Sequence, residues 1–223
     1  MLKILIDAIH QSLLPTLAIE SRSPFDPVVA NAVPPPWRLL GAGNYAAVLH
    51  HPDYADYVIK VYAPGREGWA EEVEVYRRLG AHPAFSTCFH AEPEFLVLKR
   101  LHGITLYDCL AQGRVIPKQV IQDIDRALAY ARDRNLNPHD IHGRNVMMHQ
   151  GRGLVVDISD FLKPETCNAW NDLKRAYDWF YRPLLAPLRV RVPYPVLDWV
   201  RKSYRWFRRW LRRRSAGRQS ARH

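Results

Sequence analysis

The stretch Asn137-Pro138-His139-Asp140-Ile141-His142-Gly143-Arg144-Asn145-Val146-Met147-Met148, read together with Leu154-Val155-Val156-Asp157, decides the fold of this chain. It places an Asp, then an Asn five residues later, then a second Asp at the end of an apolar strand. The Asp-to-Asn spacing alone is weak evidence, because any long chain offers several such pairs by chance. Its weight comes from further signals upstream, which follow one another in the right order.

The first upstream signal is a turn with two glycines, in the segment Leu39-Leu40-Gly41-Ala42-Gly43-Asn44-Tyr45-Ala46-Ala47-Val48-Leu49. Strand-like apolar residues flank the turn. Glycine lets the backbone approach phosphate oxygens with no side chain in the way, and Val48 would then cover an adenine ring from above. An ordinary glycine-containing hairpin has the same pattern, so both interpretations stay open at this point.

A lysine and a glutamate come next. Residues 57–62 read as a strand with Lys60 in its middle, and residues 69–79 read as a helix. Lys60 either lies on a solvated strand face or contacts ATP phosphates while a glutamate of the helix holds it. Of the three glutamates in that helix, Glu72 has apolar residues three, four and seven positions later. We therefore select Glu72 as the partner of Lys60.

Residues 95–98 form an apolar run that predicts a buried strand, and residues 99–103 suit a connector between two lobes. The backbone of such a connector would read the adenine edge, with Leu98 at the back of the pocket, although a plain core strand has the same sequence. Helices are predicted over residues 105–111 and 117–134. The second helix leads directly into the loop that contains Asp140.

From about Leu39 to Phe161 the chain resembles the protein-kinase-like superfamily. The matching residues are Gly41-x-Gly43-x-x-Ala46-x-Val48, Val58-Ile59-Lys60, Glu72, Asp140 with Asn145, and Asp157. The resemblance implies an α+β, two-lobed protein-kinase-like fold with a reduced C-terminal lobe. It also implies that Lys60 contacts phosphate and that Asp140 positions or deprotonates an acceptor hydroxyl. Asn145 and Asp157 would hold magnesium, and Met147 would lie under the adenine. The nucleotide site implied in this way consists of Gly41, Gly43, Val48, Val58, Lys60, Glu72, Leu98 and Met147.

The chain departs from the usual pattern at several positions. Pro138-His139-Asp140 replaces His-Arg-Asp, and His142 stands where Ser/Thr kinases carry Lys, which resembles aminoglycoside-phosphotransferase-like kinases. Asp157-Ile158-Ser159 replaces Asp-Phe-Gly and is similar to the atypical RIO kinases. Asp160 is a rival to Asp157, but Asp157 ends the apolar run and is preferred. No Ala-Pro-Glu element follows. Asn171-Asp172-Leu173 either starts a helix that supports the catalytic loop, as a similar Asp-Leu does in lipopolysaccharide-kinase-like proteins, or Asp172 is a solvated residue at a helix start.

The function implied by the resemblance is transfer of the γ-phosphoryl group of ATP to a hydroxyl, with Mg²⁺. The first expectation is an atypical protein Ser/Thr kinase. The second is a kinase of a small molecule or a lipopolysaccharide-core sugar, which His142, the short C-terminal lobe and the basic tail favour. The third is an ATP-binding pseudokinase scaffold without activity. His139 and His142 also suggest a metal pair, although a third ligand is not evident.

The net charge of +10 belongs to one end of the chain. Residues 201–222 carry ten Lys/Arg and no Asp/Glu, so the rest of the chain is nearly neutral. Residues 195–214 interleave aromatic and basic side chains, and Val196, Val200, Tyr204, Phe207 and Leu211 share a helical face. Such a helix suits an anionic membrane surface, or packs its apolar face on the body. Nucleic acid ranks last among the partners of this tail.

Four segments follow from these patterns: residues 1–36, 37–101, 102–194 and 195–223. The first is an amphipathic helix at 2–14 followed by a proline-rich strap at 21–36, the second and third are the two lobes, and the fourth is the basic tail. No run of about 18 apolar residues and no secretory signal is present, and the three cysteines are scattered. We therefore expect a cytoplasmic protein, peripheral at the inner face of the membrane if the tail binds lipid.

Overall fold

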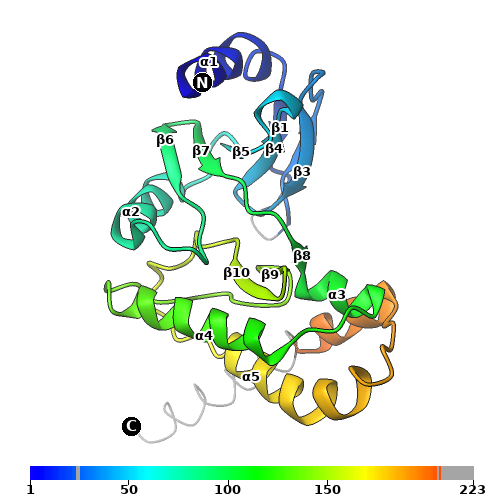
Figure 1. Ribbon diagram of the computed structural model, residues 1–223. Helices are drawn as coiled ribbons and strands as arrows, with labels where there is room; N and C mark the ends of the chain where they lie inside the picture. Colours follow the sequence, from blue (N-terminus) through cyan, green and yellow to red (C-terminus); the bar gives the residue numbers. More distant parts are fainter. Residues whose placement is uncertain (24–25, 205, 207–223) are drawn as a thin grey trace, which may run out of the picture.

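The computed structural model describes residues 1–23, 26–204 and 206. The chain forms two lobes with a mixed α+β architecture, as predicted (Figure 1). The N-terminal lobe is built on a five-stranded sheet, and the C-terminal lobe is mainly helical. The connector from β7 (Phe95–Lys99) to β8 (Ile104–Thr105) passes between the lobes.

The five-stranded sheet has the order β3-β4-β5-β7-β6, and all neighbouring strands run antiparallel. The strands are β3 (Arg38–Ala42), β4 (Ala46–His50), β5 (Tyr57–Tyr62), β6 (Cys88–Glu92) and β7 (Phe95–Lys99), and the short 3₁₀ turn η2 (Pro52–Tyr54) lies between β4 and β5. Side chains alternate between the faces of a strand. Val58 and Tyr62 of β5 therefore join the core on the side of helix α2 (Trp69–Leu79), while Ile59 and Val61 join a second core on the opposite face.

The N-terminal helix supplies that second core. Helix α1 (Leu2–Ala8) continues as the π-helical segment η1 (Ile9–Leu13), and both lie over the outer face of the sheet (Figure 1). Leu5, Ile9 and Leu13 are fully buried in a cluster with residues of the sheet. The amphipathic helix predicted at 2–14 is confirmed, and its apolar face is covered by the body.

The strap between the N-terminal helix and β3 contains a strand that the sequence did not indicate. We predicted a loop over 21–36, but β2 (Val29–Asn31) pairs with β1 (Ala18–Glu20) in a small antiparallel ribbon. The prolines around β2 obscured it. A strand of three residues depends on its partner, here through the pair Ile19 and Ala30, and not on a periodic pattern of its own.

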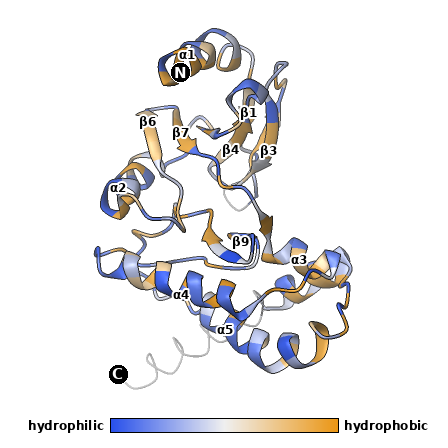
Figure 2. Ribbon diagram, in the orientation of Figure 1, coloured by the Kyte–Doolittle hydropathy of each residue, from blue (hydrophilic) through white to orange (hydrophobic). Residues whose placement is uncertain are grey.

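The C-terminal lobe consists of helices packed against a three-stranded sheet with the order β10-β9-β8. Its other elements are α3 (Leu106–Gln112), α4 (Lys118–Arg132), β9 (Val146–His149), β10 (Arg152–Val155), α5 (Ala169–Ala176) and the π-helical segment η3 (Tyr177–Leu185). Helix α4 carries both hydrophobic and hydrophilic residues along its length (Figure 2), and its predicted apolar positions are buried. The predicted helices at 105–111 and 117–134 are confirmed with ends shifted by one or two residues.

Strand β10 lies very close to helix α4. A Cβ at Gly153 would come within 2.9 Å of Ile124 Cγ1 and would also collide with the Val120 carbonyl oxygen. The Asp123 carboxylate sits at the same junction, accepting hydrogen bonds from Arg152 Nε (2.6 Å) and from the Gly153 N–H (3.1 Å). This junction fixes the strand that leads to Asp157.

Residues 194–204 are helical and lie on the C-terminal lobe beside helix α3. The side that contacts the body is polar: Asp198 accepts a hydrogen bond from the Tyr107 hydroxyl (2.8 Å), and the Tyr204 hydroxyl donates to Asp172 (2.7 Å). Trp199 and Val200 point away and are 68% and 51% exposed. The predicted face is therefore divided, because Tyr204 contacts the body whereas Val196 and Val200 are exposed. Phe207 and Leu211 lie outside the described residues.

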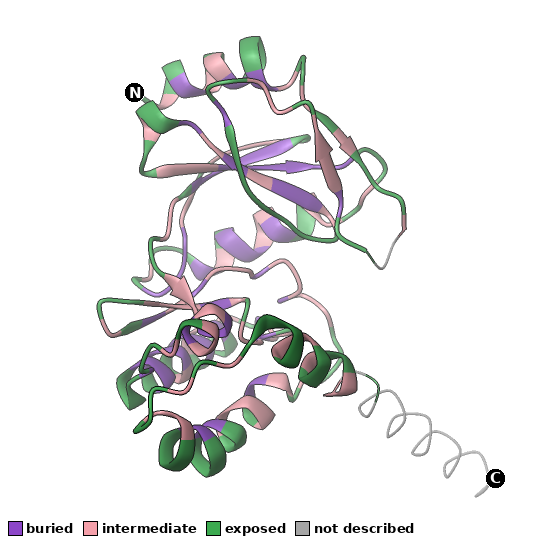
Figure 3. Cartoon of the chain, turned by 90° about the vertical axis from the view of Figure 1, so that its right-hand side faces the viewer, coloured by how far each residue is buried: buried purple, intermediate pink, exposed green. Residues whose placement is uncertain are grey.

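Figure 3 shows how unevenly the chain is buried. The central strands of the N-terminal lobe are largely buried, whereas much of η3 is exposed. Within the described residues, no helix has the length and apolar character needed to cross a membrane.

Candidate active site

A cleft of about 770 Å³ lies between the two lobes. Every residue predicted for the site lines this cleft. From the N-terminal lobe come Gly41, Gly43, Val48, Val58, Lys60, Glu72 and Leu98, and from the C-terminal lobe come Asp140, Asn145, Met147 and Asp157. The structure thus brings together residues up to 116 positions apart in the sequence, from Gly41 to Asp157.

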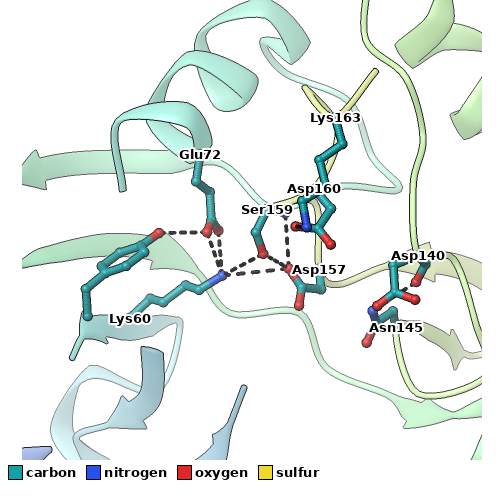
Figure 4. Close-up of polar contacts among 9 residues, drawn as sticks. Lys60, Glu72, Asp140, Asn145, Asp157, Ser159, Asp160 and Lys163 are labelled. Atoms are coloured by element: carbon teal, nitrogen blue, oxygen red, sulfur yellow. Dashed lines mark hydrogen bonds and ion pairs between the residues drawn. The ribbon is translucent and has the colours of Figure 1, made fainter. Parts of the chain in front are cut away.

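Lys60 and Glu72 form a buried ion pair at the inner end of the cleft (Figure 4). Lys60 Nζ lies 2.8 Å from Glu72 Oε1 and 2.6 Å from Oε2. Glu72 is 1% exposed, and its Oε2 also accepts a hydrogen bond from the Tyr62 hydroxyl at 2.6 Å. Burial alone would lower the pKa of Lys60, but the carboxylates of Glu72 and Asp157 outweigh it and raise the pKa. Lys60 is therefore a fixed cation.

Asp157 lies beside this pair. Its Oδ1 is 3.7 Å from Lys60 Nζ and accepts hydrogen bonds from both the N–H (3.1 Å) and the hydroxyl of Ser159. Burial opposes the charged form of Asp157, but Lys60 and Ser159 prevail and the pKa of the carboxyl is lowered. Asp157 is thus held as a carboxylate facing the cleft. Asp160, the rival candidate, is instead paired with Lys163 at 2.9 Å.

Asp140 and Asn145 lie on the opposite side of the cleft floor (Figure 4). Asp140 has a left-handed backbone with φ of 54°, a conformation that Asp tolerates better than most residues. Its carbonyl oxygen accepts a hydrogen bond from Asn145 Nδ2 at 3.1 Å, which closes the loop. Desolvation in the cleft raises the pKa of Asp140; the imidazole of His142, 3.6 Å away, opposes the shift, and Asp160 and Asp157 add to it.

Packing within the protein does not require glycine at the two glycine positions of the turn. A Cβ at Gly41 would meet no atom within 4 Å, and at Gly43 it would meet only the Ala46 carbonyl oxygen at 3.9 Å. Neither residue has a positive φ. The turn is closed by a hydrogen bond from Gly43 N to Ala46 O at 2.9 Å. The free space over these residues is what a bound group of atoms would need.

An apolar layer completes the cleft next to the connector. Val58 of β5 stands opposite Leu98 of β7, and Val48 of β4 stands opposite Lys60. Met147 reaches the same cleft from β9 in the other lobe. These side chains provide two apolar surfaces, one from each lobe, between which a flat ring can lie.

Sequence reasoning missed several residues of the site. Tyr62 and Ser159 support Glu72 and Asp157, and their contacts depend on a neighbouring element or turn that no motif describes. Arg144 and Arg201 also line the cleft. Arg144 stands within the loop that opened the sequence analysis, so its position between Asp140 and Asn145 was the available signal. Arg201 comes from the C-terminal helix, and no pattern in the sequence points to the cleft.

Oxygen ligands for a cation are present in the cleft. Asp157 offers a carboxylate, and Asn145 offers its amide oxygen because its Nδ2 is engaged by the Asp140 carbonyl. In the part of the chain that the structure describes, no three His, Cys, Asp or Glu side chains gather as in a protein-built metal cage. Mg²⁺ does not require one, since it is commonly bound through one or two protein groups together with nucleotide phosphates and water. The donor set fits magnesium.

Comparisons with known proteins place this geometry in context. No protein-family model matches the chain. The chain is 31% identical over 155 residues to the "Putative serine/threonine-protein kinase YrzF" of Bacillus subtilis (strain 168), an alignment that covers 68% of this chain and 72% of that protein. The crystal structure of a point mutant of the PknI kinase domain of Mycobacterium tuberculosis matches with a TM-score of 0.43 and 26% identity. That match spans 57% of this chain and 60% of the PknI chain.

Proposed function

This chain belongs to the protein-kinase-like superfamily, and from that premise we propose that it is an ATP-dependent phosphotransferase of the serine/threonine protein kinase type. One observation carries the proposal: the Lys60–Glu72 pair and Asp157 form one contact network at a cleft that also holds Asp140 and Asn145. A kinase needs a phosphate-binding cation, metal ligands and an acceptor-positioning carboxylate around one nucleotide.

In the proposed reaction an acceptor hydroxyl attacks the γ-phosphorus of ATP. The new P–O bond forms while the bond to the β–γ bridging oxygen breaks, ADP leaves, and the hydroxyl proton passes to a carboxylate oxygen of Asp140. The raised pKa of Asp140 brings this base closer to neutral pH, which improves proton transfer. Lys60 holds phosphate oxygens in place, and its own position is fixed by Glu72.

We propose that Asn145 and Asp157 hold Mg²⁺ when nucleotide is bound. The ion would neutralise phosphate charge, which is its general contribution in phosphoryl transfer. The hydrogen bonds from Ser159 orient one oxygen of Asp157, and the bond from Asn145 to the Asp140 carbonyl orients the amide. The adenine would lie between the apolar residues Val48, Val58 and Leu98 above and Met147 below.

The proposed acceptor is a Ser or Thr hydroxyl of a protein. The name of the B. subtilis relative supports a protein substrate over a small molecule or a lipopolysaccharide-core sugar. The pseudokinase scaffold is less supported, because Lys60 and Glu72 are already paired and the groups for metal and acceptor are all retained.

Transfer of labelled phosphate tests the proposal. We expect wild-type protein to transfer the γ-phosphate to itself or to a protein in an acceptor panel, and the panel should include sugars to test the alternative. Asp140→Asn and Lys60→Met should lower the rate by about 10² to 10⁴, since they remove the base or the phosphate contact. Asp178→Asn, an acidic residue of η3 that does not line the cleft, is the control and should retain full activity.

Equal rates in wild type, Asp140→Asn and Lys60→Met would contradict the catalytic assignment. Nucleotide binding by the wild type with no transfer to any acceptor would instead support the scaffold. Thermal melts of all four proteins would exclude unfolding as the cause of a lost rate.

We also propose a cytoplasmic enzyme that contacts an anionic membrane surface through its C-terminal segment. The three cysteines are unpaired, which suits a reducing compartment. The C-terminal helix contacts the body through polar groups and leaves Trp199 and Val200 outside, while ten Lys/Arg follow from residue 201 onward. Exposed tryptophan next to arginine suits the headgroup region of anionic lipid.

Co-sedimentation with vesicles tests this location. The full chain should bind phosphatidylserine-containing vesicles and not neutral ones, and Trp199→Glu should weaken the binding about tenfold. Ile4→Glu places the same charge on α1, where Ile4 is 61% exposed at the other end of the molecule, and should bind as wild type. Equal sedimentation of Trp199→Glu and wild type would contradict the membrane contact, and retention by nucleic acid alone would replace it.

A further inference from the structure

Two arginines from distant parts of the chain meet at the Asp198 carboxylate, and both line the cleft. Arg144 stands in the loop between Asp140 and Asn145, and Arg201 comes from the C-terminal helix. Both line the cleft together with Asp140 and His142. Arg144 follows Asp140, the proposed acceptor-positioning carboxylate, by four residues in the same loop.

Arg144 is held in a fixed orientation. Its Nη2 donates to Asp198 Oδ1 at 2.8 Å, and its guanidinium lies over the ring of Tyr107, with Cζ 4.2 Å from the ring centroid. The Tyr107 hydroxyl donates to the same Asp198 oxygen at 2.8 Å. A cation with this support loses little side-chain entropy when it binds a ligand.

A second guanidinium stands beside that of Arg144. Arg201 Nη2 also approaches Asp198 Oδ1, at 3.6 Å, so two guanidinium groups face one carboxylate. The hydrogen bond from Tyr107, helped by Arg144 and Arg201, lowers the pKa of Asp198 although partial desolvation opposes this. Asp198 is therefore ionised at neutral pH and contacts both arginines.

We propose that Arg144 and Arg201 form an anion subsite that binds an acidic side chain close to the accepting Ser or Thr, so that the enzyme selects acidic protein segments. The inference rests on the proposed function for the identity of the hydroxyl. Guanidinium groups bind carboxylates and phosphates through paired N–H donors. An Asp or Glu of the acceptor and a phosphorylated residue at the same place share this chemistry.

Peptide binding tests the subsite without requiring turnover. Four peptides carry one Ser flanked by Glu, phosphoserine, Ala or Lys, and their affinity for the full chain is measured by fluorescence anisotropy with Mg²⁺ and a non-hydrolysable ATP analogue. We expect the Glu peptide to bind about tenfold more tightly than the Ala peptide and the Lys peptide to bind least. The phosphoserine peptide tells whether phosphate or carboxylate is the preferred anion.

Two substitutions and one control assign the effect to Arg144. Arg144→Glu should reverse the order, so that the Lys peptide binds best, and Arg144→Lys should retain most of the acidic preference. Arg182→Glu is the matched control: its arginine faces Asp178 at 3.6 Å, the separation found between Arg201 and Asp198, but it does not line the cleft. This variant should keep the wild-type order.

The outcomes separate this inference from the proposed function. Equal affinity of wild type for the Glu and Lys peptides overturns the subsite, as does an unchanged order in a folded Arg144→Glu. If Arg144→Glu does not fold, Arg144→Lys and the wild-type order decide. Acidic preference with no phosphate transfer to any peptide supports the subsite and overturns the kinase activity. Transfer to all four peptides at equal rates and with equal affinities supports the kinase activity and overturns the subsite.

Discussion

Amphipathic helices lie near both ends of the chain, and they are placed in opposite ways. The N-terminal helix buries Leu5, Ile9 and Leu13 completely on the sheet. The C-terminal helix at 194–204 contacts the body through Asp198 and Tyr204 and leaves its apolar side exposed. Periodicity identifies which residues share a face of a helix, but the rest of the molecule determines whether that face is covered. One helix stabilises the lobe, and the other leaves Trp199 and Val200 exposed.

The largest effect should come from the buried face of the N-terminal helix. Ile9→Ala should lower the free energy of unfolding by about 3 kcal/mol, because it leaves a cavity in a closely packed core. Ile4→Ala on the same helix, at an exposed position, should change it by less than about 0.5 kcal/mol. Urea titration followed by tryptophan fluorescence measures both. Similar losses for the two variants would mean that the helix does not pack as described.

A polar contact of the same helix should matter less. Ser12 Oγ accepts a hydrogen bond from Trp37 Nε1 at 2.9 Å and donates to the Ala8 carbonyl at 2.7 Å. Ser12→Ala should cost about 1 kcal/mol, since the buried indole N–H then loses its partner. The same titration measures this difference. A loss larger than that of Ile9→Ala would reverse the view that apolar burial holds this helix.

In the C-terminal helix, substitutions on the polar side should have a larger effect than substitutions on the apolar side. Asp198→Ala removes the acceptor shared by Tyr107 and Arg144 and should increase trypsin cleavage after Arg201 and Lys202 about threefold, by loosening the helix. Trp199→Ala, on the exposed side, should leave cleavage unchanged within error. Mass spectrometry of timed digests identifies the cut sites. Faster cleavage in Trp199→Ala alone would show that the apolar side is the one in contact.

The smallest effect is a difference in pH response between the two helices. The pKa of Asp198 is lowered in the folded chain, so its contribution is complete above the unfolded-state value of about 3.9 and is lost as the pH falls through the folded value. Protection of the amides of 194–204 against hydrogen exchange should therefore fall below about pH 4. The amides of 2–13 should change less, although Glu92, which pairs with His10 at their edge, also has a pKa lowered by its hydrogen bonds with His90 and His10. Equal loss of hydrogen-exchange protection in both helices would contradict the predicted difference in their pH response.

Much of the candidate site could be predicted from the sequence because the motif residues stand in a fixed order. Glu72 could be selected among three glutamates from its position at the edge of an apolar stripe, and the structure places it at Lys60. Glu74, one of the others, pairs instead with Arg77 and Arg78 on the surface of α2. The two-lobed fold follows from the same order of motifs.

The rest depends on contacts that no local pattern contains. Asp198 is 54 positions from Arg144 and 91 from Tyr107, so the support of Arg144 emerges only when the chain is folded. The strand β2 has three residues between prolines and exists through its pairing with β1. The orientation of the C-terminal helix could not be read from its sequence, because its exposed and contacting sides both contain aromatic residues.

Gly153 has a consequence that extends beyond its own position. Any side chain there would push strand β10 away from helix α4, and the two residues after β10 end at Asp157. A single added methyl group would thus shift a proposed magnesium ligand without touching nucleotide, metal or acceptor. In a complete mutational scan scored only by phosphate transfer, Gly153 should tolerate substitution as poorly as Asp157 does. Such a screen alone would assign Gly153 a chemical role, although its role is to keep β10 close to α4.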